Sequence, residues 1–196
     1  MIKEIVVASK NKGKVSEIKK ILKPLDIKVY SMEDIGFNDD IEETGKTFEE
    51  NAKIKAQEIY KKTGKVVLAD DSGLEVEYLN NAPGVFSARF APTDDERIKK
   101  LLGLMDKVPE KDRKARFVCA MVLFIDNDTQ ITKKGIVEGY ISLERKGTNG
   151  FGYDPIFYVP QYEKTMAELA SDVKNKISHR ANALAKIIES IKEHNS

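Results

Sequence analysis

Short apolar runs rich in β-branched residues recur along the chain and predict the strands of a sheet. Two longer runs, ARFVCAMVLFID and QITKKGIVEGYISL, resemble a pair of strands joined by a turn, and LEVEYL alternates like a half-exposed strand. The runs that predict strands cover residues 2–8, 26–30, 65–70, 74–79, 115–126 and 130–143.

Apolar residues at three- and four-residue spacing predict helices between these strands. They occur at residues 15–25, 47–64, 94–108 and from about Ser171 to the C-terminus. In the second of these segments Thr47 and Glu50 match a capping box, and Gly64 follows the last turn. Strands that alternate with helices early, followed by an antiparallel pair, predict an α/β architecture with a mixed sheet.

The size and charge of the chain limit what it can be. With 196 residues it is long enough for a single domain over 1–196, or for two lobes that share one core. A formal net charge of +1 argues against a general nucleic-acid-binding protein, which usually has a basic excess. No apolar run reaches the roughly 18 residues of a membrane span, and the one near the N-terminus is too short for a signal peptide. We therefore expect a cytoplasmic protein with no nucleic-acid or membrane partner.

The scarcity of cysteine and histidine narrows the metals that the chain could hold. Cys119 is the single cysteine and lies in the apolar run FVCAMVLF, which predicts a buried, inert thiol. The two histidines, His179 and His194, are too few for a histidine-cluster metal site. A bound metal would therefore be held by oxygen, which favours a hard cation such as Mg²⁺.

A polar turn connects the first predicted strand to the first predicted helix. Such a turn points backbone N–H groups and the positive end of the helix at one place, where a phosphate could bind. Its spacing is not that of a Walker A motif, and a lysine-rich turn that is merely solvated explains it about as well. The turn consists of Ser9, Lys10, Asn11, Lys12, Gly13 and Lys14.

Two acidic segments are candidates for a metal or a catalytic carboxylate. Asp70 and Asp71 directly follow a buried strand, and adjacent strand residues point to opposite faces, so the two would have different roles if the strand continued. One would then face a cleft at the carboxyl end of the strand; an Asx turn with two solvated carboxylates is the alternative. Glu42 and Glu43 stand just before a helix, where they could ligate a metal or simply complement the helix dipole.

Two segments in the second half of the chain carry candidate ligand-binding groups. Residues 147–155 (GTNGFGYDP) contain closely spaced glycines, and the rings of Phe151 and Tyr153 could either stack on a nucleobase or fill the core. On the C-terminal helix, Lys174 and Ser178 would share a face and be followed by His179-Arg180, although charges on a helix surface are usually solvated.

Taken together, these segments resemble the inosine triphosphate pyrophosphatase family, and the resemblance covers nearly the whole chain. Asn149 replaces the more usual Gly of that family. The implied fold is α/β, with a long, curved, mixed β-sheet flanked by helices and two lobes around a nucleotide-binding cleft, usually as a homodimer. The matching segments are SxNxxK at 9–14, EETGxTFxENAxxKA at 42–56, ADDSGLxV at 69–76, APGVFSARF at 82–90, KARFVC at 114–119, GTxGFGYDPIF at 147–157 and ISHRAxAL at 177–184.

The resemblance implies a role for each matching residue. Asp71 matches the catalytic proton acceptor, which is also associated with the metal, and Glu43 matches a magnesium ligand. Ser9, Asn11 and Lys14 match the phosphate-binding turn, and Lys10, Lys12 and Gly13 of the same turn are expected to bind the substrate with them. The remaining matches are substrate contacts: Lys55, Ser72 and Lys174, the base-packing loop Phe151, Gly152, Tyr153 and Asp154, and the base-reading pair His179 and Arg180.

The implied activity is the Mg²⁺-dependent hydrolysis of non-canonical purine nucleoside triphosphates (ITP, dITP and XTP) to the monophosphate and pyrophosphate. Arg180 can only donate hydrogen bonds, so it would donate to the O6 of hypoxanthine or xanthine and disfavour the amino group of adenine, which is itself a donor. A pyrophosphatase for modified pyrimidine nucleotides, or a nucleotide-binding protein without catalysis, are the alternative functions.

Overall fold

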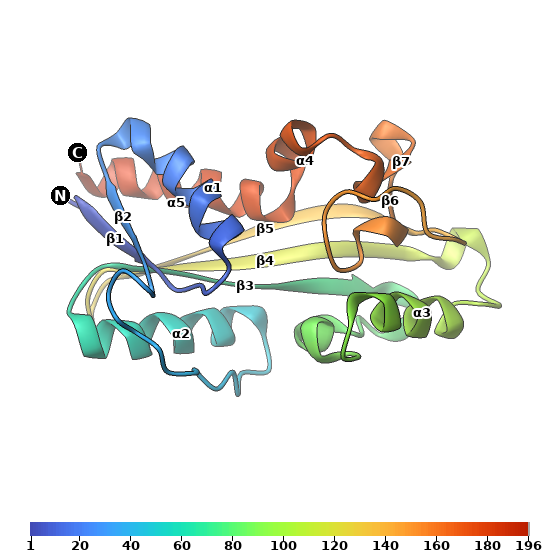
Figure 1. Cartoon of the computed structure of the whole chain (residues 1–196), viewed down its shortest axis with the longest axis horizontal. Coiled ribbons are helices and arrows are strands. Elements are labelled where there is room, and N and C mark those ends of the chain that lie inside the picture. The colour runs from blue at the N-terminus through green and yellow to red at the C-terminus, as the bar shows by residue number, and fades with distance from the viewer. Residues whose placement is uncertain (196) are drawn as a thin grey trace. The chain divides into compact units, whose positions relative to one another are not determined.

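The computed structural model describes residues 1–195, apart from the side chain of Glu17. Seven strands form one mixed sheet in the order β2-β1-β3-β4-β5-β6-β7 (Figure 1). β1 is parallel to β2 and β3, whereas β6 is antiparallel to β5 and β7, so the predicted mixed α/β architecture is confirmed. The strands are β1 (Glu4–Val7), β2 (Lys28–Ser31), β3 (Val67–Val76), β4 (Lys114–Phe124), β5 (Gln130–Ile141), β6 (Phe157–Val159) and β7 (Lys164–Thr165).

Five α-helices accompany the sheet among the described residues: α1 (Lys12–Leu22), α2 (Phe48–Thr63), α3 (Asp94–Leu104), α4 (Ser171–Ile177) and α5 (His179–Asn195). The predicted capping box of Thr47 and Glu50 is present at the start of α2, and Gly64 ends this helix with φ 62°. Short 3₁₀ helices cover Lys23–Leu25, Glu77–Leu79, Gly84–Arg89, Glu110–Asp112, Asp154–Ile156, Pro160–Tyr162 and Met166–Glu168. No helix in residues 1–195 is long and apolar enough to cross a membrane.

Two predicted boundaries are wrong. The sequence suggested that a strand ends at Asp70-Asp71 and that a second one follows, but β3 runs through both residues without interruption. The single helix expected from Ser171 onward is two helices, because Ser178 has an extended backbone (φ −61°, ψ 151°) between α4 and α5. The hydroxyl of Ser178 accepts a hydrogen bond from the amide of Ala181 (3.1 Å), so it caps α5 in the way that serine commonly begins a helix.

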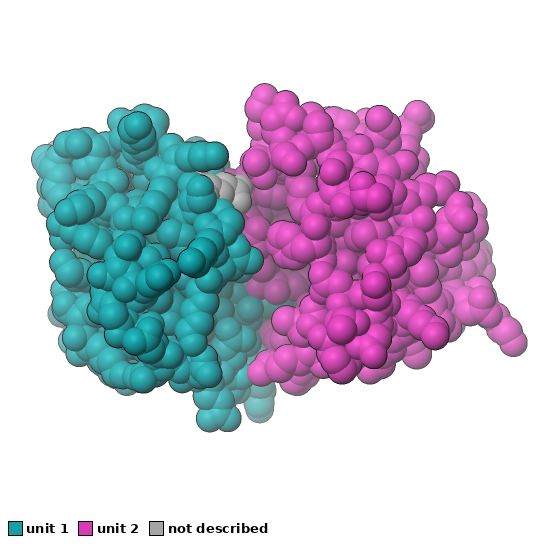
Figure 2. Space-filling model, in the orientation of Figure 1, with its two compact units in different colours: residues 1–71, 120–134, 183–196 teal, residues 72–119, 135–182 magenta. Residues whose placement is uncertain are grey.

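The chain divides into two compact units, shown in different colours in Figure 2. Unit 1 consists of Met1–Asp71, Ala120–Lys134 and Ala183–Ser196, and unit 2 of Ser72–Cys119 and Gly135–Asn182. β3, β4 and β5 each contribute residues to both units, so neither unit is one continuous stretch of the chain.

Each unit has its own hydrophobic cluster. In unit 1, α2 lies on one face of the strands, and α1 and α5 lie on the other (Figure 1). The α2 face buries Ala52, Ala56 and Ile59 against Val67 and Ala69 of β3. Unit 2 has a cluster formed by α3, the strands and the segments around β6, and it includes Leu74, Leu101, Phe117, Tyr153 and Phe157. The Cys119 thiol is buried, as predicted.

Candidate functional site

The polar turn after β1 becomes the N-terminus of α1. Asn11 is the N-cap, and its side-chain oxygen accepts a hydrogen bond from the amide of Lys14 (3.1 Å), while the hydroxyl of Ser9 accepts one from the amide of Asn11 (3.2 Å). The helix begins at Lys12, earlier than the apolar spacing predicted. Lys12, Gly13 and Lys14 therefore form its first turn, where backbone N–H groups have no partner within the helix and are suited to bind an anion.

The lysines of this turn are directed at different partners. The ammonium groups of Lys10 and Lys12 lie near the carboxylates of Asp40 (2.5 Å) and Glu33 (3.7 Å), which belong to the loop after β2. Lys14 instead forms an ion pair with Asp70 (2.8 Å). A pocket of about 590 Å³ lies beside the turn and is lined by Ser9, Lys10, Lys12, Val15, Ser16, Lys19, Ser31, Met32, Glu33, Asp34, Phe37 and Asn38.

Asp70 and Asp71 point to opposite sides of β3, as expected for adjacent residues in a continuing strand. Asp70 is buried (5% exposed) and accepts the ion pair from Lys14 of α1. Asp71 is on the side of α2, where its Oδ2 accepts a hydrogen bond from the side-chain amide of Asn51 (2.9 Å). The two carboxylates therefore have different environments, and the Asx-turn alternative is excluded because the backbone is a strand.

Glu43, Lys55 and Asp71 form a compact charged cluster in unit 1. Nζ of Lys55 lies 2.8 Å from Oε1 of Glu43 and 3.9 Å from Oδ1 of Asp71. All three side chains are mostly buried; that of Glu43 is the most exposed, at 29%. The ammonium between the two carboxylates offsets the repulsion that would otherwise separate them. Glu43 of the acidic loop and Asp71 therefore lie on the same ammonium group, a contact that the sequence spacing could not decide.

The donor set of this cluster fits a hard cation with few protein ligands. Two carboxylates converge on one place, and Mg²⁺ is usually held by one or two carboxylates together with phosphate oxygens and water. Within residues 1–195, no three His, Cys, Asp or Glu side chains gather as a metal-binding group.

Asn51 is a site residue that sequence reasoning missed. It stands one helical turn before Lys55 on α2, and its side chain is completely buried. Its Nδ2 donates to Asp71, and its Oδ1 accepts a hydrogen bond from the amide of Gly45 (2.8 Å). The signal was the four-residue spacing of Asn51 and Lys55, which places both on the same helix face.

The glycine-rich loop of unit 2 is built around a buried carboxylate. Asp154 is 5% exposed, and its Oδ2 accepts hydrogen bonds from the amide of Phe151 (2.9 Å) and from the ammonium of Lys174. Gly150 has φ 82°, and a Cβ there would lie 2.1 Å from the Asp154 oxygen, so only glycine fits. The amide of Gly152 donates to Asp94 of α3 (2.8 Å). The loop is therefore held from both sides.

The two aromatic residues of this loop have opposite environments. Phe151 is 57% exposed, and its ring lies beneath the ammonium of Lys174 (4.8 Å to the ring centroid). Tyr153 is 4% exposed in the core of unit 2, where its hydroxyl donates to the carbonyl of Ser87 (2.9 Å) and burial raises the pKa of its phenol. Of the alternatives left open by the sequence, Tyr153 fills the core and Phe151 does not.

The remaining predicted residues of unit 2 are Ser72, His179 and Arg180. Ser72 follows Asp71 in β3 and is half-buried. His179 begins α5 and stacks on the ring of Phe117 (5.0 Å between centroids, 15° between planes), and Arg180 is 7% exposed. Because α4 ends at Ile177, Lys174 and this pair stand on different helices, and the shared face expected for Lys174 and Ser178 does not exist.

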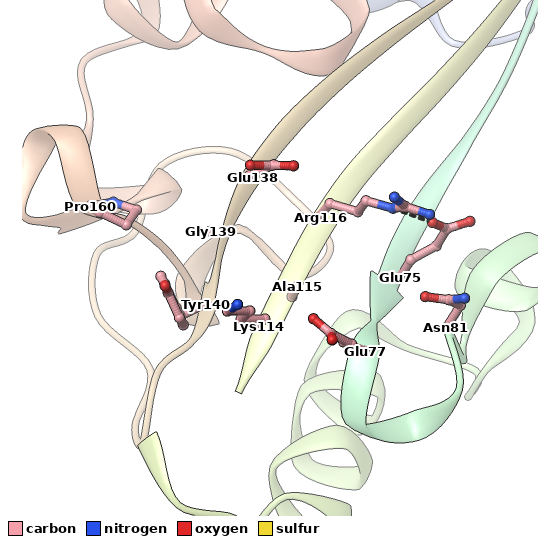
Figure 3. A pocket seen from close by; sticks show the side chains of 10 residues that line it. All are labelled: Glu75, Glu77, Asn81, Lys114, Ala115, Arg116, Glu138, Gly139, Tyr140 and Pro160. Carbon is pink, nitrogen blue, oxygen red and sulfur yellow. Dashed lines mark hydrogen bonds and ion pairs between the residues drawn. The ribbon is translucent and has the colours of Figure 1, made fainter. Parts of the chain in front are cut away.

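A separate hollow of about 630 Å³ lies on unit 2 and contains none of the predicted site residues (Figure 3). Its charged side chains come from β3, β4, β5 and the 3₁₀ helix that begins at Glu77, and Arg116 and Glu75 pair with each other at 2.6 Å. The hollow is lined by Glu75, Glu77, Asn81, Lys114, Ala115, Arg116, Glu138, Gly139, Tyr140 and Pro160.

Comparison with known proteins finds close relatives over almost the full chain. The sequence model of the Ham1 family matches residues 5–190. A Bacillus licheniformis protein named dITP/XTP pyrophosphatase is 54% identical over 189 residues (95% of this chain, 96% of the relative), and its Bacillus subtilis namesake is 50% identical over 190 residues (95% and 96%). A solved structure of a HAM1 protein from Coxiella burnetii superposes with a TM-score of 0.92 at 46% identity, covering 98% of this chain and 100% of the other.

Proposed function

Because the chain belongs to the Ham1 family, we propose that it hydrolyses non-canonical purine nucleoside triphosphates to the monophosphate and pyrophosphate. The relatives from Bacillus, which are named dITP/XTP pyrophosphatase, support dITP and XTP as substrates. We expect ITP as well, because it carries the same hypoxanthine base as dITP. The observation that carries the proposal is the cluster of Glu43, Lys55 and Asp71, since it offers two carboxylates and a lysine to a polyphosphate.

The triphosphate is proposed to bind at the N-terminus of α1. The N-terminal turn of α1 and the positive end of the helix favour an anion there, and Asn11 fixes this turn as the N-cap by accepting a hydrogen bond from the amide of Lys14. Lys10 and Lys12 add charge at the rim of the neighbouring pocket. Their carboxylate partners are exposed, so phosphate oxygens can replace those partners at little cost.

Asp71 is proposed to orient the attacking water and to accept its proton, and Glu43 to share a metal with it. When bound, Mg²⁺ would neutralise charge on the phosphate oxygens and on the leaving pyrophosphate. Water attack at the α-phosphorus breaks the bond to the bridging oxygen and releases pyrophosphate. Lys55 keeps the two carboxylates close together and adds positive charge next to the reacting group.

The base is proposed to be recognised by residues of unit 2. Phe151 is exposed and offers its ring for stacking, while Gly152 and Asp154 hold the loop in place. Arg180 is proposed to donate a hydrogen bond to O6 of the purine, and His179 to contact the base beside it. Adenine has an amino group in place of O6, so the donors of Arg180 would face another donor. Ser72 and Lys174 are proposed as further contacts to the substrate. We also expect a homodimer in the cytoplasm.

The proposed activity is tested with a substrate panel and product analysis. ITP, dITP, XTP, ATP, GTP, dUTP and methylated UTP are incubated with the protein, with Mg²⁺ or with a chelator, and pyrophosphate and inorganic phosphate are both quantified. We expect pyrophosphate from ITP, dITP and XTP only, and only with the metal. Inorganic phosphate as the product, or a preference for the pyrimidine nucleotides, would refute the proposal, and nucleotide binding without turnover would favour the non-catalytic alternative.

A further inference from the structure

The side chain of Asn51 connects the acidic loop to β3. It is completely buried, and both of its polar atoms are used: Nδ2 donates to Oδ2 of Asp71 (2.9 Å), and Oδ1 accepts from the amide of Gly45 (2.8 Å). The amide of asparagine carries its donor and its acceptor on separate atoms, so one short side chain can bind two different segments at the same time. One buried group therefore contacts both segments that carry the proposed metal ligands.

The loop on the other side of this contact is shaped to fit it. Gly45 stands two residues after Glu43, and a Cβ at this position would lie 2.6 Å from Oδ1 of Asn51 and 2.7 Å from Cβ of Glu50. Only a residue without a side chain brings its amide this close to the helix. The amide of Lys46 also donates to Glu50 (2.6 Å), so the backbone after Glu43 is fixed against the start of α2.

The hydrogen bond to Asp71 also orients its carboxylate. With Oδ2 held by Asn51, Oδ1 is turned toward Lys55, 3.9 Å away, and Lys55 in turn contacts Glu43. A carboxylate without the Asn51 contact could rotate about its last torsion, because such torsions are broad. The amide thus selects which oxygen of Asp71 is on the side of Glu43.

From this arrangement we propose that Asn51 is a positioning residue that sets the separation of Glu43 and Asp71 and orients the Asp71 carboxylate for metal binding. The inference rests on the proposed function, since it gives these two carboxylates the role of metal ligands. Removing a hydrogen bond to a ligating carboxylate typically lowers metal affinity about 10–100-fold, and we expect an effect of this size.

The test measures Mn²⁺ binding to the nucleotide-free protein from the electron paramagnetic resonance signal of the free ion. The Asn51→Ala and Gly45→Ala variants remove the contact from its two sides. Ile59→Ala, on the same helix and fully buried, is the control for a loss of stability alone. Melting temperatures of all variants, and the Mn²⁺ concentration that gives half-maximal dITP hydrolysis, are recorded in parallel.

We expect Mn²⁺ affinity to fall about 10-fold or more in Asn51→Ala and Gly45→Ala, and to stay within about twofold in Ile59→Ala. The same shift is expected in the Mn²⁺ concentration for half-maximal hydrolysis, with a smaller change in the KM for dITP. If Mn²⁺ affinity is unchanged in a folded Asn51→Ala protein, the inference about Asn51 is wrong. The proposed function still stands in that case, provided that the wild type hydrolyses dITP. If Asn51→Ala does not fold, Gly45→Ala decides in the same way, and a wild-type protein without metal-dependent hydrolysis refutes both proposals.

Discussion

Lys14 of α1 and Asp70 of β3 form an ion pair in which Nζ lies 2.8 Å from Oδ2, with the Asp70 side chain only 4% exposed. The pair links the first turn of α1 to β3 within unit 1. Lys14 thus contacts Asp70, whereas Asp71, on the opposite side of the strand, contacts Asn51 and Lys55. The two neighbouring carboxylates can therefore be told apart by experiment.

The Lys14–Asp70 pair should contribute to stability. Removing one partner of a poorly solvated pair lowers the free energy of unfolding more than removing one partner of an exposed pair. In a double-mutant cycle of Lys14→Met and Asp70→Asn, we expect a coupling of about 1–3 kcal/mol in the free energy of unfolding, measured with urea. The exposed pair of Lys19 and Asp34 serves as the control and should show no measurable coupling. Equal coupling in the two pairs would contradict this account.

Arg113 should be a structural residue of unit 2 rather than a part of the site. Its buried guanidinium donates to backbone carbonyls at Met105, Val108, Ile141 and Ser142, so its removal leaves these acceptors without their donor. Arg113→Met should lower the free energy of unfolding by about 3 kcal/mol or more. Arg116→Met, which breaks a single ion pair of a half-exposed arginine with Glu75, should cost about 1 kcal/mol or less. Similar losses for both variants would be inconsistent with the buried network.

Tyr153 should make the stability sensitive to alkaline pH. Its folded-state pKa is raised by burial, so the stability due to the neutral phenol is complete below the unfolded pKa of about 10 and is lost as the pH rises above it. Tyr153→Phe removes both this ionisation and the bond to Ser87, and should cost about 1 kcal/mol at pH 8. The difference between the two proteins should shrink in urea unfolding between pH 10 and 11, on the order of 1 kcal/mol per pH unit. A difference that stays constant with pH would show that the phenol is solvated.

Phe151 should act on substrate binding and not on stability. Loss of base stacking costs about 1–3 kcal/mol, so Phe151→Ala should raise the KM for dITP about 5- to 150-fold with little change in kcat. Its exposure predicts a change in unfolding free energy within about 0.5 kcal/mol. Leu143→Ala, at an equally exposed position of unit 2, should leave both quantities unchanged. A normal KM for Phe151→Ala, measured by pyrophosphate release, would remove this residue from the site.

Features that depend on a few neighbouring residues could be predicted from the sequence. The ends of α2 follow from Thr47, Glu50 and Gly64, whose capping interactions are local. The continuity of β3 could not be predicted, because Asp70-Asp71-Ser72-Gly73 is a typical turn sequence. The strands beside β3 are distant in sequence: β1 pairs with Val67 and Leu68 at its start, and β4 is its other neighbour in the sheet.

Contacts between residues that are distant in sequence also limited the prediction of the candidate site. The residue types that suit phosphate and a hard cation could be recognised, but not the pairs that they form. Lys174 is expected to contact the substrate, and its ion pair with the buried carboxylate of Asp154 could not be read from the sequence. Tyr153 resembles Phe151 in the sequence, but it is buried in unit 2, where its hydroxyl donates to the carbonyl of the distant Ser87. Such differences arise from packing over long sequence separations.

The central claim is that Asp71, and not Asp70, is the reacting carboxylate. The most direct test is the single-turnover rate of dIMP formation from saturating dITP and Mg²⁺, compared between Asp71→Asn and Asp70→Asn at a temperature where both are folded. Asp71→Asn should be slower than the wild type by about 10²–10⁴-fold, since it loses a general base, whereas Asp70→Asn should stay within about 10-fold. A slow Asp70→Asn variant together with a near-normal Asp71→Asn variant would contradict the account.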